Sequence, residues 1–174
     1  QISPKVKIVL GGNSGPPNKT AGYTFLYDLY DLGGKGLFDI FNYHHYSQNE
    51  APDEGWSHPD YWYSIFNSFF KEKDPNLEIW VTETGYATDG KIVSEVVTPA
   101  QQTSNLIKMY TLLFSLERIK KVFLYELIDR PENSLSYGVY QQNLKAKLAS
   151  RTLRIFLLLL KDKNFERKIS YTNK

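Results

Sequence analysis

The sequence predicts an α/β fold in which strands and helices alternate along the chain. Runs rich in β-branched and aromatic residues recur four times, and turn-forming residues follow each run within a few positions. Between the runs, apolar residues recur at intervals of three and four, which is the period of an amphipathic helix. Four strand–helix pairs in this order predict a parallel sheet covered by helices.

The first pair and the second strand occupy the N-terminal quarter of the chain. The apolar run Val6–Leu10 predicts a buried strand, which a pair of glycines ends. Apolar residues at helical spacing between positions 25 and 32 predict the helix that follows. The second strand is expected over Leu37–Tyr43, and it leads into the cluster His44-His45-Tyr46.

The second helix has a proline near its start and an aromatic stripe. Ser57 is a suitable N-cap, and Pro59 stands in the first turn. The stripe at helical spacing consists of Tyr61, Trp62, Ile65, Phe66, Phe69 and Phe70. The third strand is expected over Glu78–Thr82.

The remaining elements are bounded by equally local signals. The segment Thr98-Pro99-Ala100-Gln101 has the form of a capping box with proline at the first helical position, and this helix is expected to reach Glu117. The fourth strand is expected over Val122–Ile128, and the last helix over Lys145–Lys161.

Composition excludes several classes of function. The 174 residues suffice for one domain with a sizeable core, and a hydrophobic content of 41% indicates a globular chain. A net charge of +2 without a basic stripe argues against a nucleic-acid partner. The apolar run Leu157–Leu160 is far shorter than a membrane span. No H-E-x-x-H motif or phosphate-binding fingerprint occurs, so we expect no metal, no cofactor, no nucleic acid and no membrane.

Two architectures accommodate four strand–helix pairs. They fill half of an eight-stranded (β/α)8 TIM barrel, which takes about 250 residues. A doubly wound open sheet is the alternative, but the chain lacks the G-x-G-x-x-G turn of many such folds. We therefore expect residues 1–174 to form one domain of the TIM-barrel type that contains only four of the eight pairs.

The third strand ends in a carboxylate. If side chains alternate strictly, Ile79, Val81 and Glu83 share one face of this strand. A glutamate on the apolar face of a buried strand is unfavourable unless its charge is used there. At the carboxyl end of a barrel strand, that use is usually catalysis. Glu83 is therefore the candidate catalytic residue, and the alternative is a helix cap or a lysine partner.

The strand ends resemble those of the clan A retaining glycoside hydrolases, which are (β/α)8 glycosidases. Phe38–Tyr46 is similar to their sixth strand, with an Asp and then His-x-Tyr. Trp80–Tyr86 resembles the seventh, and Val122–Asp129 with Tyr137–Tyr140 resembles the eighth. Lys5–Gly12 is a weaker match to the fifth. The resemblance covers nearly the whole chain and implies the C-terminal half of a glycosidase barrel.

This resemblance gives roles to residues near the strand ends. It implies that Glu83 is the nucleophile, that Tyr46 hydrogen-bonds it and that His44 lies near the sugar. Alternation places Asn42 on the same face as His44 and Tyr46, so all three are candidate substrate-binding residues. The alternative for them is an ordinary aromatic rim. His45, with the opposite parity, is expected to face helices.

Two further substrate-binding candidates follow these strands. Trp56, in the loop after the second strand, is the tryptophan expected to be exposed to sugar. Glu126 is either a substrate ligand or the partner of an arginine, and the second interpretation is preferred. Leu124 stands where many members of the family carry a tryptophan that stacks on sugar. Tyr125 can take that place only if the register shifts.

The sequence offers no candidate for the general acid of the expected site. A retaining mechanism needs a second carboxyl about 5 Å from the nucleophile. In the family it follows an asparagine at the end of the fourth strand, and no such Asn-Glu pair ends a strand here; Asn49-Glu50 lies in a loop. Three interpretations remain: part of a carbohydrate-cleaving glycoside hydrolase, a half-barrel that binds carbohydrate without cleaving it, or a structural or interaction scaffold.

The expected first and last strands have open edges. Neither carries a proline or an inward-facing lysine to prevent pairing with other chains. We therefore expect the chain to associate with a missing N-terminal half-barrel or with a second copy of itself as a homodimer.

Overall fold

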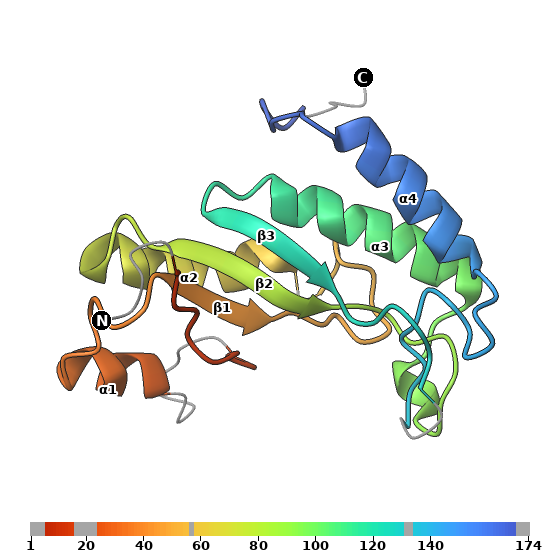
Figure 1. Ribbon diagram of the computed structural model, residues 1–174, viewed down its shortest axis with the longest axis horizontal. Helices are drawn as coiled ribbons and strands as arrows, with labels where there is room; N and C mark the ends of the chain where they lie inside the picture. Colours follow the sequence, from red (N-terminus) through yellow and green to blue (C-terminus); the bar gives the residue numbers. More distant parts are fainter. Residues whose placement is uncertain (1–5, 16–23, 56–57, 131–133, 170–174) are drawn as a thin grey trace.

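The computed structural model describes residues 6–15, 24–55, 58–130 and 134–169 (Figure 1). One parallel sheet in the order β1-β2-β3 contains β1 (Ile40–His44), β2 (Glu78–Thr84) and β3 (Ile119–Leu124). The helices are α1 (Phe25–Asp31), α2 (Pro59–Lys73), α3 (Pro99–Phe114) and α4 (Leu148–Leu160), with the short 3-10 helix η1 (Val93–Glu95) before α3.

The helices bury one face of the sheet in a single apolar core. Leu26 of α1 and Leu153 of α4 belong to the same buried cluster as the aromatic side chains of α2. The ring of Phe41 in β1 lies 4.8 Å from that of Phe66 and 4.9 Å from that of Phe70, both in α2. Strands that follow one another in chain order, with helices on one face, are typical of part of an α/β barrel. The predicted α/β fold with a parallel sheet is confirmed.

Capping signals predicted the start of α3 correctly and that of α2 incorrectly, and α4 begins at Leu148 instead of the expected Lys145. The Thr98 hydroxyl oxygen accepts a hydrogen bond from the Gln101 amide at 3.2 Å, and the Gln101 side chain accepts one from the Thr98 amide at 2.9 Å. The predicted capping box is therefore confirmed. At α2 the prediction is wrong, because the N-cap is His58, whose Nδ1 accepts from the Asp60 amide at 3.1 Å. Ser57 lies outside the described residues.

The expected first strand is not a regular strand. Residues 6–13 run parallel to β1 and are joined to it by isolated bridges, Val9 with Ile40 and Asn13 with Tyr43. No strand among the described residues lies on the outer side of this segment. Its backbone is therefore held from one side only, and Val6 is 57% exposed. The described chain has three strands where four were predicted.

The last strand lies earlier in the sequence than predicted. β3 spans Ile119–Leu124 instead of 122–128, so it includes Lys121. The ammonium of Lys121 lies 4.3 Å from the ring centroid of Trp80, on the sheet face opposite the helices. The expectation that the edge strand has no inward-facing lysine is therefore wrong.

Candidate functional site

The strand β2 contains a bulge just before its carboxyl end. With β1 the pairing stays in step up to Tyr43 and Val81, whereas with β3 it already shifts once between Ile79 and Trp80. Beyond Val81, β2 has one residue more than either neighbour. The pairs that show this are Tyr43 with Val81 and then His44 with Glu83 on one side, and Val81 with Val122 and then Thr84 with Leu124 on the other.

This bulge decides which way Glu83 points. Ile79 and Val81 are fully buried against the helices, and strict alternation predicts the same face for Glu83. The extra residue turns Glu83 to the opposite face of the sheet, where it meets His44 and Tyr46. The predicted face of Glu83 is therefore wrong, although its position at the end of β2 is as predicted.

The Glu83 carboxylate is held by two side chains. The Tyr46 hydroxyl donates a hydrogen bond to Glu83 Oε2 at 2.9 Å, and His44 Nδ1 lies 3.3 Å from the same oxygen. Burial, followed by the hydrogen bond to Glu83, raises the pKa of Tyr46 far above its ordinary value. The phenol therefore stays protonated and remains a donor. The Glu83 side chain is still 33% exposed, so another molecule can reach it.

The segment before β1 fixes His44 from the other side. The His44 amide donates to the Asn13 carbonyl oxygen at 2.8 Å. A Cβ atom at Gly12 would overlap the His44 imidazole, so only glycine allows this close approach. The imidazole therefore lies between Gly12 and Glu83, with little freedom to move.

Asn42 lies in the sheet below this site and is 4% exposed. Its amide group donates to the Leu10 carbonyl oxygen and accepts from the Thr82 hydroxyl at 2.6 Å. The side chain thus joins the N-terminal segment, β1 and β2. This arrangement makes Asn42 a support for the strand ends, and its predicted contact with substrate stays a prediction.

Three tyrosines form a cluster beside the nucleophile candidate. The ring of Tyr46 lies 6.3 Å from Tyr125 and 5.6 Å from Tyr137, and these two lie 5.6 Å apart. All three pairs meet edge to face. Tyr125 thus lies beside Tyr46, whereas Leu124 packs against the core, and stacking of Tyr125 on sugar stays a prediction. Sequence reasoning missed Tyr137 as a site residue, and the Tyr-Gly pair in the loop after β3 was its only signal.

Glu126 has an arginine partner. Arg130 Nε donates to Glu126 Oε2 at 2.5 Å, and the same guanidinium donates to the Tyr125 hydroxyl at 2.6 Å. The carboxylate side chain is only 11% exposed. The structure thus shows the preferred alternative for Glu126, in which it pairs with an arginine that also anchors Tyr125.

A buried ion pair supports the loop that carries Tyr137. Lys147 Nζ lies 2.8 Å from Asp129 Oδ2 and donates to the Thr88 hydroxyl at 3.0 Å. The same aspartate accepts from the Gly138 amide at 2.8 Å. The lysine and aspartate side chains are 10% and 16% exposed, so this network ties the loops after β2 and β3 to the start of α4.

The remaining sequence candidates lie elsewhere. His45 is fully buried, and its ring lies 5.2 Å from that of Trp62 in α2, as its parity predicted. Trp56 lies outside the described residues. The described residues contain no cluster of three or more acidic or histidine side chains suited to hold a metal ion. In this same part of the chain, no helix is both long and apolar enough to cross a bilayer.

Solved structures with the same fold include glycoside hydrolases. A family 39 glycoside hydrolase from Bacteroides cellulosilyticus WH2 matches 94% of this chain with a TM-score of 0.76 and 22% identity. A GH2 β-galacturonidase from Eisenbergiella tayi, bound to galacturonate, matches 74% with a TM-score of 0.55 and 16% identity. A Ruminococcus gnavus β-glucuronidase matches 69% with a TM-score of 0.51 and 16% identity.

These likenesses show that the chain shares its fold with part of each enzyme. It spans 36%, 25% and 22% of their respective chains. No protein-family model matches the sequence, and neither does any curated protein. The likeness to these glycoside hydrolases is therefore one of fold.

Proposed function

We propose that this chain supplies the nucleophile, Glu83, of a retaining glycoside hydrolase. One observation carries the proposal: at the carboxyl end of β2, the Glu83 carboxylate accepts a hydrogen bond from Tyr46 and lies beside His44. A hydrogen bond from the neutral hydroxyl of Tyr46 holds the carboxylate in place and favours its charged form. The fold shared with glycoside hydrolases supports the same assignment.

In the proposed reaction, Glu83 is the residue of this chain that forms a covalent bond to the sugar. An oxygen of Glu83 bonds to the anomeric carbon as the bond from that carbon to the leaving-group oxygen breaks. The leaving oxygen takes a proton from a general acid, and a glycosyl ester of Glu83 forms. Water, deprotonated by the same acid–base group, then releases the sugar and restores the carboxylate. Because Tyr46 and His44 both contact Oε2, Oε1 is the oxygen that attacks.

The general acid is expected on an N-terminal half-barrel, after an asparagine at a strand end. A leaving group that needs no proton removes this requirement. The chain alone should therefore form the glycosyl ester on Glu83 slowly with a 2,4-dinitrophenyl glycoside and leave an unactivated disaccharide intact. Mass spectrometry of the digested chain detects the ester.

The alternatives give different results in the same experiment. Sugar binding without any ester on Glu83 would support a carbohydrate-binding half-barrel, which the missing Asn-Glu pair favours. No sugar binding at all would support a structural scaffold. Cleavage of the disaccharide would show that a carboxyl of this chain replaces the acid.

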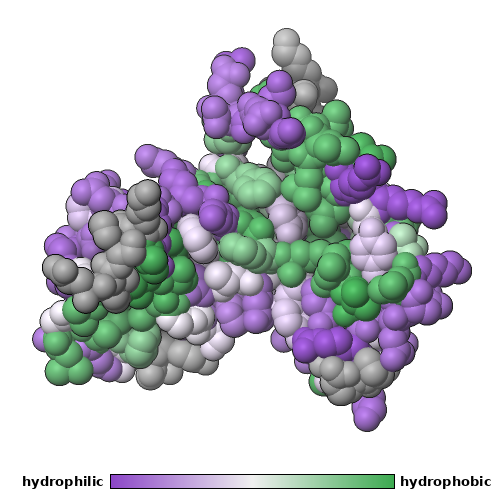
Figure 2. All heavy atoms as spheres, viewed as in Figure 1, coloured by the Kyte–Doolittle hydropathy of each residue, from purple (hydrophilic) through white to green (hydrophobic). Residues whose placement is uncertain are grey.

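One face of α4 has no partner among the described residues. Leu148, Ile155 and Leu159 lie on one side of this helix and are 55%, 60% and 70% exposed. Leu153, on the side that meets α3, is 6% exposed. Apolar side chains gather over α4 in the space-filling view (Figure 2). Such a surface is typical of an interface that is missing its other half.

We therefore expect the chain to form homodimers or aggregates when it is expressed alone. Together with an N-terminal half-barrel it should form a monomeric 1:1 complex, because the open edge of β3 and the exposed face of α4 both become covered. Sedimentation velocity at tens of micromolar separates these cases. A stable, well-folded monomer of the lone chain would contradict the half-barrel interpretation.

A further inference from the structure

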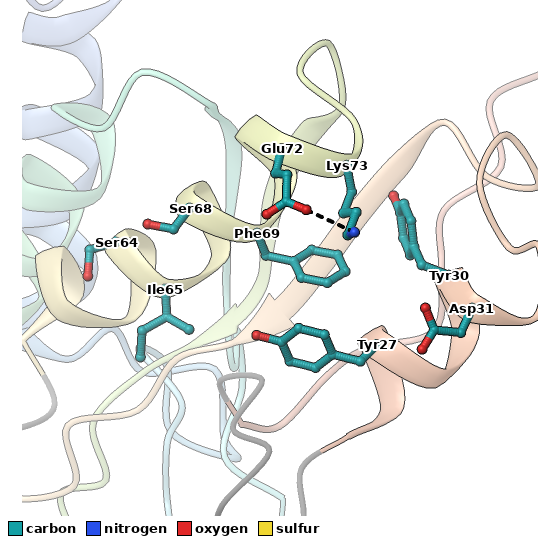
Figure 3. A pocket seen from close by; sticks show the side chains of 9 residues that line it. All are labelled: Tyr27, Tyr30, Asp31, Ser64, Ile65, Ser68, Phe69, Glu72 and Lys73. Atoms are coloured by element: carbon teal, nitrogen blue, oxygen red, sulfur yellow. Dashed lines mark ion pairs between the residues drawn. The ribbon is translucent and has the colours of Figure 1, made fainter.

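A hollow lies between α1 and α2 (Figure 3). Its volume is about 580 Å³, which is in the range of small-molecule sites. The lining reaches the last residue of each helix, Asp31 in α1 and Lys73 in α2, and β2 begins soon after α2, at Glu78. The hollow is therefore near the amino ends of the strands, whereas Glu83 lies at the carboxyl end of β2.

The floor of this groove is aromatic. Phe69 of α2 is 7% exposed and meets two tyrosine rings of α1 edge to face. The centroid distances are 5.0 Å to Tyr27 and 5.1 Å to Tyr30, with interplanar angles of 87° and 86°. Burial, together with Asp74, raises the pKa of Tyr30 to about 12, so its hydroxyl remains protonated. Flat rings of this kind suit the C–H face of a sugar.

The rim on α2 carries hydrogen-bonding groups at regular spacing. Ser64, Ser68 and Glu72 line the groove at intervals of four residues. Four residues of α-helix rise about 6 Å, so one polar group stands on each turn above the aromatic floor. A ligand with one apolar face and hydroxyl groups along its edge fits this arrangement.

The groove carries two carboxylates and one ammonium. Lys73 Nζ lies 2.9 Å from Glu72 Oε1, so these two charges largely cancel, and Asp31 leaves the groove with a net negative charge. Glu72 foremost, with a contribution from Asp31, raises the pKa of Lys73, so this ammonium keeps its charge. The groove therefore repels anions, and a neutral polyol suits it, because carboxylates and hydroxyls can hydrogen-bond a polyol without a charge on the ligand.

We propose that the groove between α1 and α2 binds neutral oligosaccharide as a second carbohydrate site, separate from Glu83. Sugar rings lie against Tyr27 and Tyr30, which Phe69 holds in place from below, and their hydroxyl groups bond to Ser68 and Glu72. The site goes beyond the proposed hydrolysis, because it holds sugar without acting on it. The loss of either site leaves the other intact.

The test is binding of neutral trisaccharides by the full chain, followed by NMR of its aromatic side chains. Cellotriose and xylotriose should shift the signals of Tyr27 and Tyr30 with a Kd on the order of 1 mM, as expected for an open groove. Trigalacturonate should bind this groove at least about tenfold more weakly, because its carboxylates are repelled by the net negative charge of the groove.

Ser68→Arg places a long side chain across the groove from an exposed helix position. It should weaken the response at Tyr27 by about tenfold or more and leave the signals of Tyr46 and Tyr137 responsive, since those report the Glu83 site. Ser104→Arg makes the same change at an exposed position of α3 and should have no effect. Unshifted Tyr27 and Tyr30 signals at 20-fold the expected Kd, or unchanged binding by Ser68→Arg, would overturn the proposal.

Discussion

Glu83→Gln is expected to lower kcat of the completed glycosidase by a factor on the order of 10³ or more. The amide keeps the size of the carboxylate and still accepts a hydrogen bond from Tyr46, so the fold should not change. It has no negative charge with which to attack the anomeric carbon, and the covalent step is lost. Steady-state kinetics on an aryl glycoside measures the effect.

Glu78→Gln provides the matched control at the other end of the same strand. Glu78 pairs with Lys7 at 3.0 Å on an exposed edge, and that pair lowers its pKa. Exposed pairs contribute little to stability, so this variant should keep near-normal activity. Normal turnover by Glu83→Gln, with the control also normal, would show that the nucleophile is another residue.

Gly85→Ala should destabilise the chain by about 3 kcal/mol, because a large overlap with main-chain atoms cannot be relieved by rotating a side chain. A Cβ atom at this position would overlap the Tyr125 carbonyl oxygen. The Tyr125 amide also donates to the Thr84 carbonyl at 2.8 Å, so the two backbones cannot separate without breaking the sheet. Chemical denaturation gives the change in the free energy of unfolding.

Gly11→Ala tests whether the loss of stability in Gly85→Ala is caused by the steric overlap. A Cβ atom at Gly11 would meet no atom within 4 Å, and neither glycine has a left-handed backbone. The control variant should therefore unfold like the parent chain. If both variants lose stability equally, the cause is the general effect of alanine in these turns and the overlap at Gly85 is not decisive.

Local patterns predicted the elements of this fold well. The alternation of strands and helices, the capping box at Thr98 and the stripe of α2 depend on neighbours in the sequence. The stripe is buried except at Ile65, which is half-buried, and at Tyr61, which is 54% exposed. The first strand was over-predicted because apolar residues indicate burial, whereas Val6 and Ile8 lie at an edge and are 57% and 39% exposed. Whether a second neighbour covers such an edge is a long-range property that the run Val6–Leu10 does not encode.

The candidate site was predictable in its members and not in its geometry. The positions of Glu83, His44 and Tyr46 at strand ends followed from the motifs. The face of Glu83 did not, because a bulge depends on pairing with both neighbouring strands. Tyr137 is also hard to find from sequence, since the network around Asp129 and Lys147 brings its loop to the site.

The position of Lys121 restricts which half-barrel could complete this one. In the open chain its ammonium lies over Trp80 and is exposed to water, which solvates the charge. Closure of the barrel would enclose the same ammonium, and an unpaired charge in a closed interior is strongly unfavourable. We therefore expect any half-barrel that completes this one to present an acidic group opposite Lys121. Lys121 would then select its partner by complementary charge.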